Sequence, residues 1–256
     1  MATIVAARRL SSTTVRDLLL LGLTVSSGAV DAISFLALGK VFTAFMTGNV
    51  VFLGLGIAGA GGPDAVRVLL AIGAYAAGVY AATRIVEMAD DDPGVWPRRV
   101  TVALGVAMTM EAAFLVGWVA TSGRPGIGSG DMLTSVIALA MGLQSGAVMA
   151  LAVRGVFTTA ATATVMFLVR DIAARSASAT ERARIDAPRL DSAATERARL
   201  AGVLLALLVG ATAGGLLLAH ARTWAPVLPL VATALVVATA TVAFHRRDGT
   251  EAEGRL

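Results

Sequence analysis

Residues 18–38 read LLLLGLTVSSGAVDAISFLAL, an apolar run in which Asp31 is the only charged residue. A helix needs about 20 predominantly apolar residues to cross the hydrocarbon core of a bilayer. The run meets that length, and it is too long for the core of a signal peptide. We therefore predict that residues 18–38 stay in the mature protein as a membrane helix.

The rest of the chain repeats this pattern. Mean hydropathy is +0.79, and 15% of the residues are charged, against about 25% in a soluble domain. Apolar runs of comparable character occupy residues 18–38, 41–60, 68–83, 100–121, 132–153, 155–169, 200–219 and 223–244. This composition excludes an ordinary soluble domain. It predicts an all-α polytopic transmembrane helical bundle with six to eight membrane segments, for which the lipid bilayer is the first partner.

Composition also limits the chemistry. The chain has no Cys and two His, so the sequence offers no thiolate site and no imidazole cluster for a metal. It contains no phosphate-binding loop, no Gly-x-Ser-x-Gly elbow and no His-Glu-x-x-His helix. We therefore predict that the protein is not an enzyme and holds neither a cofactor nor a metal. Its net charge of +4 comes from arginines between the apolar runs, so nucleic acid is not expected as a partner.

One long polar stretch, residues 171–199, separates two apolar runs and contains the hexapeptide ATERAR at 179–184 and again at 194–199. Its arginines predict a cytoplasmic location, because cytoplasmic loops collect Arg and Lys. The stretch is either a charged connector or a docking site for a partner or anionic lipid. The predicted division is a cytoplasmic segment 1–17, a first membrane repeat 18–121, a second repeat 131–244 interrupted by loop 171–199, and a cytoplasmic tail 245–256.

Two internal sequence matches indicate the repeat. Residues 41–53 align with residues 156–168 with seven of the 13 pairs identical, and residues 73–78 align more weakly with residues 210–215. Because the two matches occur in the same order, we predict two homologous halves. Internal duplication of this kind is typical of transporters, whose sites lie where the halves meet.

Two topologies remain open. If all eight runs span the membrane, the halves are parallel and 15 of the 21 basic residues are cytoplasmic. If residues 41–60 and 155–169 re-enter instead, six helices span, the halves are inverted and 17 of the 21 are cytoplasmic. Both arrangements satisfy the positive-inside rule and place both termini in the cytoplasm. The charge count favours re-entry, whereas the length of residues 41–60 favours a full span.

Two carboxylates, Asp31 and Glu111, lie inside apolar runs. Ionisable groups are costly there and usually functional, so both are candidate proton or cation sites. The alternative for Asp31 is a structural carboxylate paired with Lys40 or with an arginine of a neighbouring helix. Gln144 is a further interior polar group, flanked by small residues.

Small and polar residues also recur at matching places in the two halves, each set preceded by a basic residue. Such faces either line a path or join helices by hydrogen bonds, and the basic residues could meet an anionic substrate or lipid headgroup. The full set of transport or binding candidates is Asp31, Lys40, Thr43, Thr47, Gly48, Asn49, Glu111, Gln144, Arg154, Thr158, Thr159 and Thr162.

Two motifs carry a family resemblance. Residues 28–35, GAVDAISF, precede MTGN at residues 46–49, and this combination resembles the YoaK-like family of bacterial integral membrane proteins of unknown function. The second half matches the family in part, with GLQS at residues 142–145 and TTAATA at residues 158–163. Ser145 and Ala163 stand where the family pattern has Asn and Gly. The resemblance implies that Asp31, Thr47, Gly48 and Asn49 belong together.

These observations favour a small-solute transporter or channel of the bacterial inner membrane, coupled to a proton or cation, with an unknown substrate. The alternative is a membrane module without transport activity that binds lipid or a partner protein. Gly210 and Gly214 permit close helix packing, which is compatible with a homodimer.

Overall fold

The computed structural model describes residues 11–87, 94–151, 153, 165–166, 169 and 187–245, with side chains described for 198–244 of the last range. Its labelled helices are α1 Ser12–Ala37, α2 Met46–Ile57, α3 Ala65–Glu87, α4 Arg98–Ala120, α5 Ile127–Met149, α8 Ala187–His220 and α9 Val227–Ala240. A short turn of 3-10 helix, Arg222–Trp224, precedes α9, and a π-helical turn, Thr241–His245, follows it. The described residues include no strand, which confirms the all-α prediction.

Six helices within the described residues are long and apolar enough to cross a bilayer: α1, α3, α4, α5, residues 198–220 of α8, and residues 222–244 around α9. Large apolar side chains on their outer surfaces are exposed, as at Val116, which is 70% exposed. A soluble protein rarely exposes contiguous apolar surface of this kind, whereas lipid accommodates it. The chain is therefore a multi-pass membrane protein.

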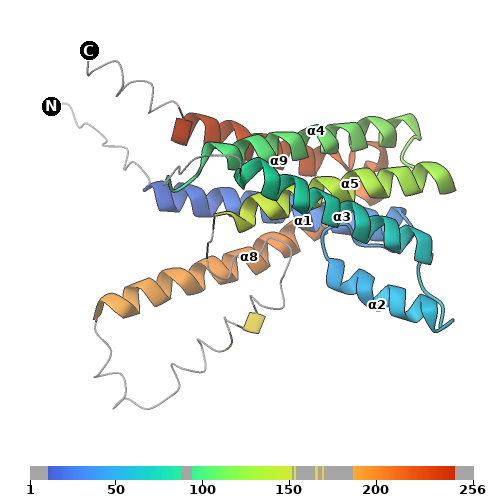
Figure 1. The fold of residues 1–256 in the computed structure, drawn as a ribbon, viewed down its shortest axis with the longest axis horizontal. Helices are drawn as coiled ribbons and strands as arrows, with labels where there is room; N and C mark the ends of the chain where they lie inside the picture. The colour runs from blue at the N-terminus through green and yellow to red at the C-terminus, as the bar shows by residue number, and fades with distance from the viewer. Residues whose placement is uncertain are drawn as a thin grey trace.

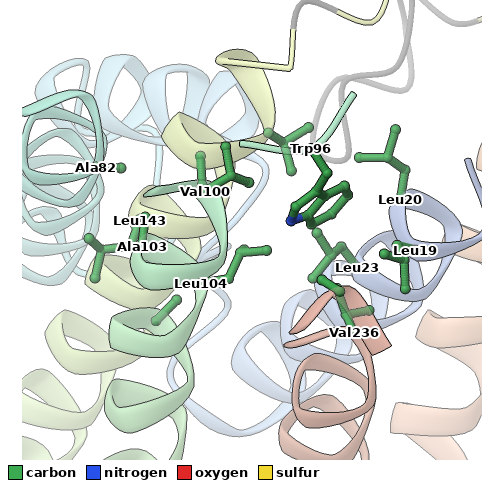
Figure 2. Close-up of a cluster of buried hydrophobic side chains, with 14 of the residues drawn as sticks. Leu19, Leu20, Leu23, Ala82, Trp96, Val100, Ala103, Leu104, Leu143 and Val236 are labelled. Atoms are coloured by element: carbon green, nitrogen blue, oxygen red, sulfur yellow. The ribbon is translucent and has the colours of Figure 1, made fainter. Parts of the chain in front are cut away.

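The six helices alternate in direction between two buried clusters. One cluster contains Trp96, Leu20 and Val236, and we call its side of the bundle the Trp96 end (Figure 2). The other contains Trp118 and Leu133 and marks the Trp118 end. Helices α1, α4 and α8 run from the Trp96 end to the Trp118 end, and α3, α5 and α9 run back (Figure 1). The N-terminal set α1, α3, α4 is thus antiparallel to the C-terminal set α5, α8, α9.

Helix α2 does not cross the bundle. Its 12 residues extend about 18 Å at 1.5 Å per residue, against about 30 Å of hydrocarbon. Because α1 ends and α3 begins at the same Trp118 end, the chain between them enters and leaves on one side (Figure 1). A full span for residues 41–60 is therefore wrong. The cause lies at Gly39 and Lys40, whose positive φ values of 85° and 63° turn the chain back before α2 begins.

Two pairs of helices pack with almost no side chain between them. A Cβ on Gly28 of α1 would strike the carbonyl oxygen of Leu207 in α8, and a Cβ on Gly142 of α5 would strike that of Tyr75 in α3. Gly210 and Gly214 face α1 in the same way. This glycine pair therefore packs against a helix of the same chain and does not lie on an outer surface.

Each of these helix pairs also contacts a third helix, which gives two three-helix units. The α1 unit comprises α1, α8 and α9, and the α5 unit comprises α3, α4 and α5. The units meet where α1 and α9 contact α4 and α5. We call this contact the inter-unit interface.

Candidate functional site

Glu111 lies in the inter-unit interface, where three helices bring polar side chains together. Its Oε1 accepts a hydrogen bond from the Thr233 hydroxyl of α9 at 3.0 Å, and the Ser26 hydroxyl of α1 lies at 3.5 Å. Thr233 Oγ1 also lies 3.3 Å from Ser26 Oγ. Ser26 and Thr233 are fully buried, and Glu111 is 1% exposed. The sequence marked Glu111 but not these partners, because a hydroxyl in an apolar run also serves ordinary helix packing.

The second carboxylate oxygen of Glu111, Oε2, is buried and has no hydrogen-bond partner among the described residues. The ion pairs in the described part of the chain join Arg16 to Asp17, Arg67 to Asp131 and Arg199 to Asp17, and none includes Glu111. A membrane carboxylate normally pairs with a basic group or faces a water-filled cavity. Glu111 instead has hydroxyl neighbours and one open acceptor, an arrangement suited to taking up a proton or cation.

Gln144 forms a second polar contact across the same interface, between α5 and α1. Its Nε2 donates to Ser27 Oγ at 2.9 Å and to the Leu23 carbonyl at 3.2 Å. Gln144 Oε1 and the hydroxyl of neighbouring Ser145 are buried without partners among the described residues. Gln144 and Glu111 thus contact consecutive residues of α1, Ser27 and Ser26.

Asp31 has a different environment. Its Oδ1 accepts the backbone N–H groups of Thr43 at 2.9 Å and of Ala44 at 2.8 Å, so the carboxylate holds the segment that leads into α2. Neither of the predicted partner types pairs with it, because the ion pairs of the described residues omit Asp31 and Lys40 is exposed. Asp31 therefore positions the segment that leads into α2.

The MTGN motif holds the same segment from the other side. Asn49 accepts the Phe42 N–H with Oδ1 at 3.0 Å and donates with Nδ2 to the Phe42 carbonyl at 2.6 Å. A Cβ on Gly48 would lie 2.9 Å from the Phe45 ring, so only glycine fits there without rearrangement. These contacts explain why the motif requires both Asn and Gly.

The predicted polar face of residues 43–49 is not one continuous surface. Thr43 is buried with its hydroxyl 3.4 Å from Ser34 Oγ, Asn49 is buried in its own hydrogen bonds, and Thr47 is exposed. The corresponding second-half candidates, Arg154, Thr158, Thr159 and Thr162, lie outside the described residues.

An apolar groove of about 490 Å³ lies beside Asp31, between α1, the segment before α2, and α8. Phe35, Phe42 and Phe45 form much of its wall, with the Phe35 and Phe42 rings stacked at a centroid distance of 5.0 Å. Its surface is almost wholly hydrocarbon, so it suits an apolar group better than a charged one.

Two Arg–Asp pairs lie at opposite ends of the bundle, and the sequence did not single them out because their members flank the apolar runs. Arg67 Nε, in the first turn of α3, donates to Asp131 of α5 at 2.6 Å, and its other nitrogens reach the Leu38 and Ile127 carbonyls. Arg199 of α8 lies 3.9 Å from Asp17 of α1. Each pair joins the two helices that a glycine crossing already holds together.

Comparison with known proteins agrees with this architecture. The chain is 35% identical over 160 residues to the UPF0700 transmembrane protein YoaK of Bacillus subtilis (strain 168), an alignment that covers 62% of this chain and 68% of the relative. No solved structure matches the chain. A family model described as "Protein of unknown function (DUF1275)" matches residues 19–239. The resemblance to YoaK-like proteins is thereby confirmed, and the chain belongs to this family of membrane proteins.

Proposed function

We propose that the protein is a small-solute transporter or channel of the bacterial inner membrane, coupled to a proton or cation that Glu111 binds. The observation that carries the proposal is the buried Glu111 carboxylate, with one oxygen open, in the interface between two three-helix units. Intramembrane carboxylates of this kind mark ion pathways by default. The proposal includes no catalytic step, no cofactor and no nucleic-acid partner.

We further propose that the two antiparallel sets of helices are inverted repeats. Gly28 and Gly142 make the same contact in their own helix pairs, and they lie 114 positions apart. Asp17 and Asp131 are also 114 positions apart, and each pairs with an arginine. A common origin accounts for this shared offset.

The partner helices share a second offset. Leu207 and Tyr75, whose carbonyls face those two glycines, are 132 positions apart. The arginines of the two ion pairs, Arg67 and Arg199, have the same separation. The equivalent helices are therefore α1 with α5, α3 with α8, and α4 with α9.

Inverted repeats support a transport role because each repeat can adopt the conformation of the other. In many transporters such repeats meet near the middle of the membrane, and rocking of one helical unit against the other opens the site to each side in turn. Here the helix pairs that contain the glycines belong to separate units, while hydrogen bonds of Glu111 and Gln144 cross between the units. Relative movement of the units would therefore change the surroundings of both polar groups.

Flux measurements test the transport proposal. The full chain is reconstituted into phosphatidylethanolamine/phosphatidylglycerol vesicles loaded with a pH-sensitive dye. Currents and internal pH are then followed after the external concentration of amino acids, carboxylates, sugars or monovalent cations is raised. At least one solute is expected to produce a current or pH change, which Glu111→Gln removes and the exposed control Glu87→Gln leaves intact. A wild-type chain that is silent to every solute would contradict transport and favour the alternative, a module that binds lipid or a partner protein.

The orientation follows from charge, since the six-span topology assigns 17 of the 21 basic residues in the sequence to the side on which α1 begins. We therefore propose that both termini are cytoplasmic. Because the chain lacks native Cys, Ala60→Cys should react with a membrane-impermeant maleimide in intact cells, and Glu87→Cys only after lysis. The reverse pattern would invert the protein in the membrane, and labelling of both in intact cells would contradict the six-span topology.

A further inference from the structure

The group around Glu111 consists entirely of oxygen atoms. Besides the two carboxylate oxygens it contains Ser26 Oγ, Thr233 Oγ1 and the carbonyl oxygen of Pro229 in α9, which lies 3.4 Å from Ser26 Oγ. All four residues are buried. Oxygen-only ligand sets that combine a carboxylate, hydroxyls and a carbonyl are those that hard cations prefer.

The hydrogen atoms available do not account for all contacts in this group. Ser26 Oγ approaches both Glu111 and Pro229, and Thr233 Oγ1 approaches both Glu111 and Ser26. Each hydroxyl has a single hydrogen to donate, so at most two of the four contacts can be hydrogen bonds at one time. An ionised Glu111 contributes no donor. The remaining contacts bring oxygen atoms near one another without a hydrogen between them, and a positive charge among these oxygens would stabilise the group.

The distances agree with such a charge. Three of the four contacts measure 3.3, 3.4 and 3.5 Å, longer than the ~2.7–2.8 Å typical of an O–H···O hydrogen bond. Calcium, whose ionic radius is close to that of sodium, binds oxygen at ~2.3–2.6 Å, and two ligands at a right angle are then about 3.3–3.7 Å apart. The spacings from Ser26 Oγ to the oxygens of Thr233, Pro229 and Glu111 therefore match those between neighbouring ligands in the shell of an ion of this size.

The charge of the site selects the valence of the ion. Glu111 supplies one negative charge, no Arg or Lys of the described ion pairs neutralises it, and the described residues include no cluster of His, Cys, Asp and Glu that would suit a divalent or transition metal. A single positive charge makes the site neutral, which is the condition for low cost inside a bilayer. Two positive charges would leave an excess.

We propose that Ser26, Glu111, Thr233 and the Pro229 carbonyl form a binding site for a monovalent alkali cation of the size of Na⁺, between α1, α4 and α9. The site deepens the proposed function by naming the coupling ion, and it rests on that function only for the claim that the ion is transported. Gln144 donates to Ser27, the residue next to Ser26 in α1, and is not counted among the four ligands.

Equilibrium binding of ²²Na⁺ to the full chain in detergent tests the site without requiring flux. At alkaline pH, where protons compete least, wild-type protein should bind ²²Na⁺ saturably, with displacement by unlabelled Na⁺ and not by choline. Glu111→Gln should abolish binding, and Thr233→Val, which removes one ligand oxygen at nearly constant volume, should weaken it by about tenfold to 100-fold, the range seen when groups that support a metal site are removed. Glu87→Gln, at the exposed end of α3, is the matched control.

The possible outcomes separate the two proposals. Folded wild-type protein without saturable ²²Na⁺ binding would overturn the site and leave a proton as the ion for Glu111. If Glu111→Gln fails to fold, the Thr233→Val and Ser26→Ala variants decide the question, and unchanged affinity in both would place the ion elsewhere. Binding of ²²Na⁺ without flux in vesicles would contradict transport and retain the site. Flux without ²²Na⁺ binding would support transport and contradict the site.

Discussion

Substitution of Gly142 by leucine is expected to separate α5 from α3 and to destabilise the protein by about 3 kcal/mol, the upper part of the usual range for overpacking. The Cβ alone would strike the Tyr75 carbonyl and come within 3.0 Å of the Val79 nitrogen. Neither atom can move without displacing the backbone of α3. For a chain of this size, the loss corresponds to a fall of roughly 6–12 °C in the apparent Tm, measured from the soluble monodisperse fraction after heating in detergent.

Gly73→Leu is the matched control for this prediction. Gly73 is also a helical glycine, in α3, but a Cβ there meets nothing within 4 Å. Its apparent Tm should therefore stay close to that of the wild type. Gly210→Leu tests the equivalent crossing, because a Cβ on Gly210 would strike the Val25 carbonyl of α1. Equal Tm values for Gly142→Leu and Gly73→Leu would show that the α3–α5 contact is not as close as described.

The second large effect is expected at Asp31. Asp31→Ala removes the acceptor of the Thr43 and Ala44 N–H groups, and each buried donor left without a partner costs about 1–3 kcal/mol. The segment before α2 should then detach from α1. In a background with Ala44→Cys, a residue that is 2% exposed, the thiol should be protected when Asp31 is present and should react rapidly with maleimide in Asp31→Ala.

Asp31→Asn distinguishes positioning from charge. The asparagine carbonyl can accept the same two N–H groups, so the thiol at position 44 should remain protected and the vesicle fluxes should persist. A variant Asp31→Asn that keeps the thiol protected but loses every flux would show that the charge of Asp31 is itself needed. In that case Asp31 would join Glu111 as an ion-binding group.

Apolar runs were sufficient to predict the helices, because membrane spans are defined by length and composition. They did not distinguish a membrane span from the short helix within residues 41–60, since both are apolar in sequence. The difference depends on the backbone at Gly39 and Lys40. Gly39 follows the C-cap of α1, a position at which glycine commonly ends a helix, whereas the left-handed φ of Lys40 has no sequence signature.

The two acids within apolar runs illustrate a second limit. Asp31 and Glu111 have similar apolar surroundings in the sequence, yet one binds backbone N–H groups nearby in the chain and the other meets hydroxyls from α1 and α9. Local patterns cannot report partners so far away.

The register of the proposed repeat shows the same limit. The sequence match aligned Gly73 with Gly210, whereas the contacts make Gly78 the equivalent of Gly210. Small residues recur so often in α3 and α8 that identity alone does not fix their alignment.

The pairing of α1 with α8 has a consequence for biosynthesis. Gly28 and its partner Leu207 are separated by 179 positions, which a ribosome takes roughly 9–36 s to translate at about 5–20 residues per second. During that interval α1 leaves the translocon with its closest-packing surface uncovered, while α3 and α5 can already associate. The helices of the α5 unit are thus all synthesised before the α1 unit can form, and the surface of α1 that packs against α8 stays without its partner until α8 emerges.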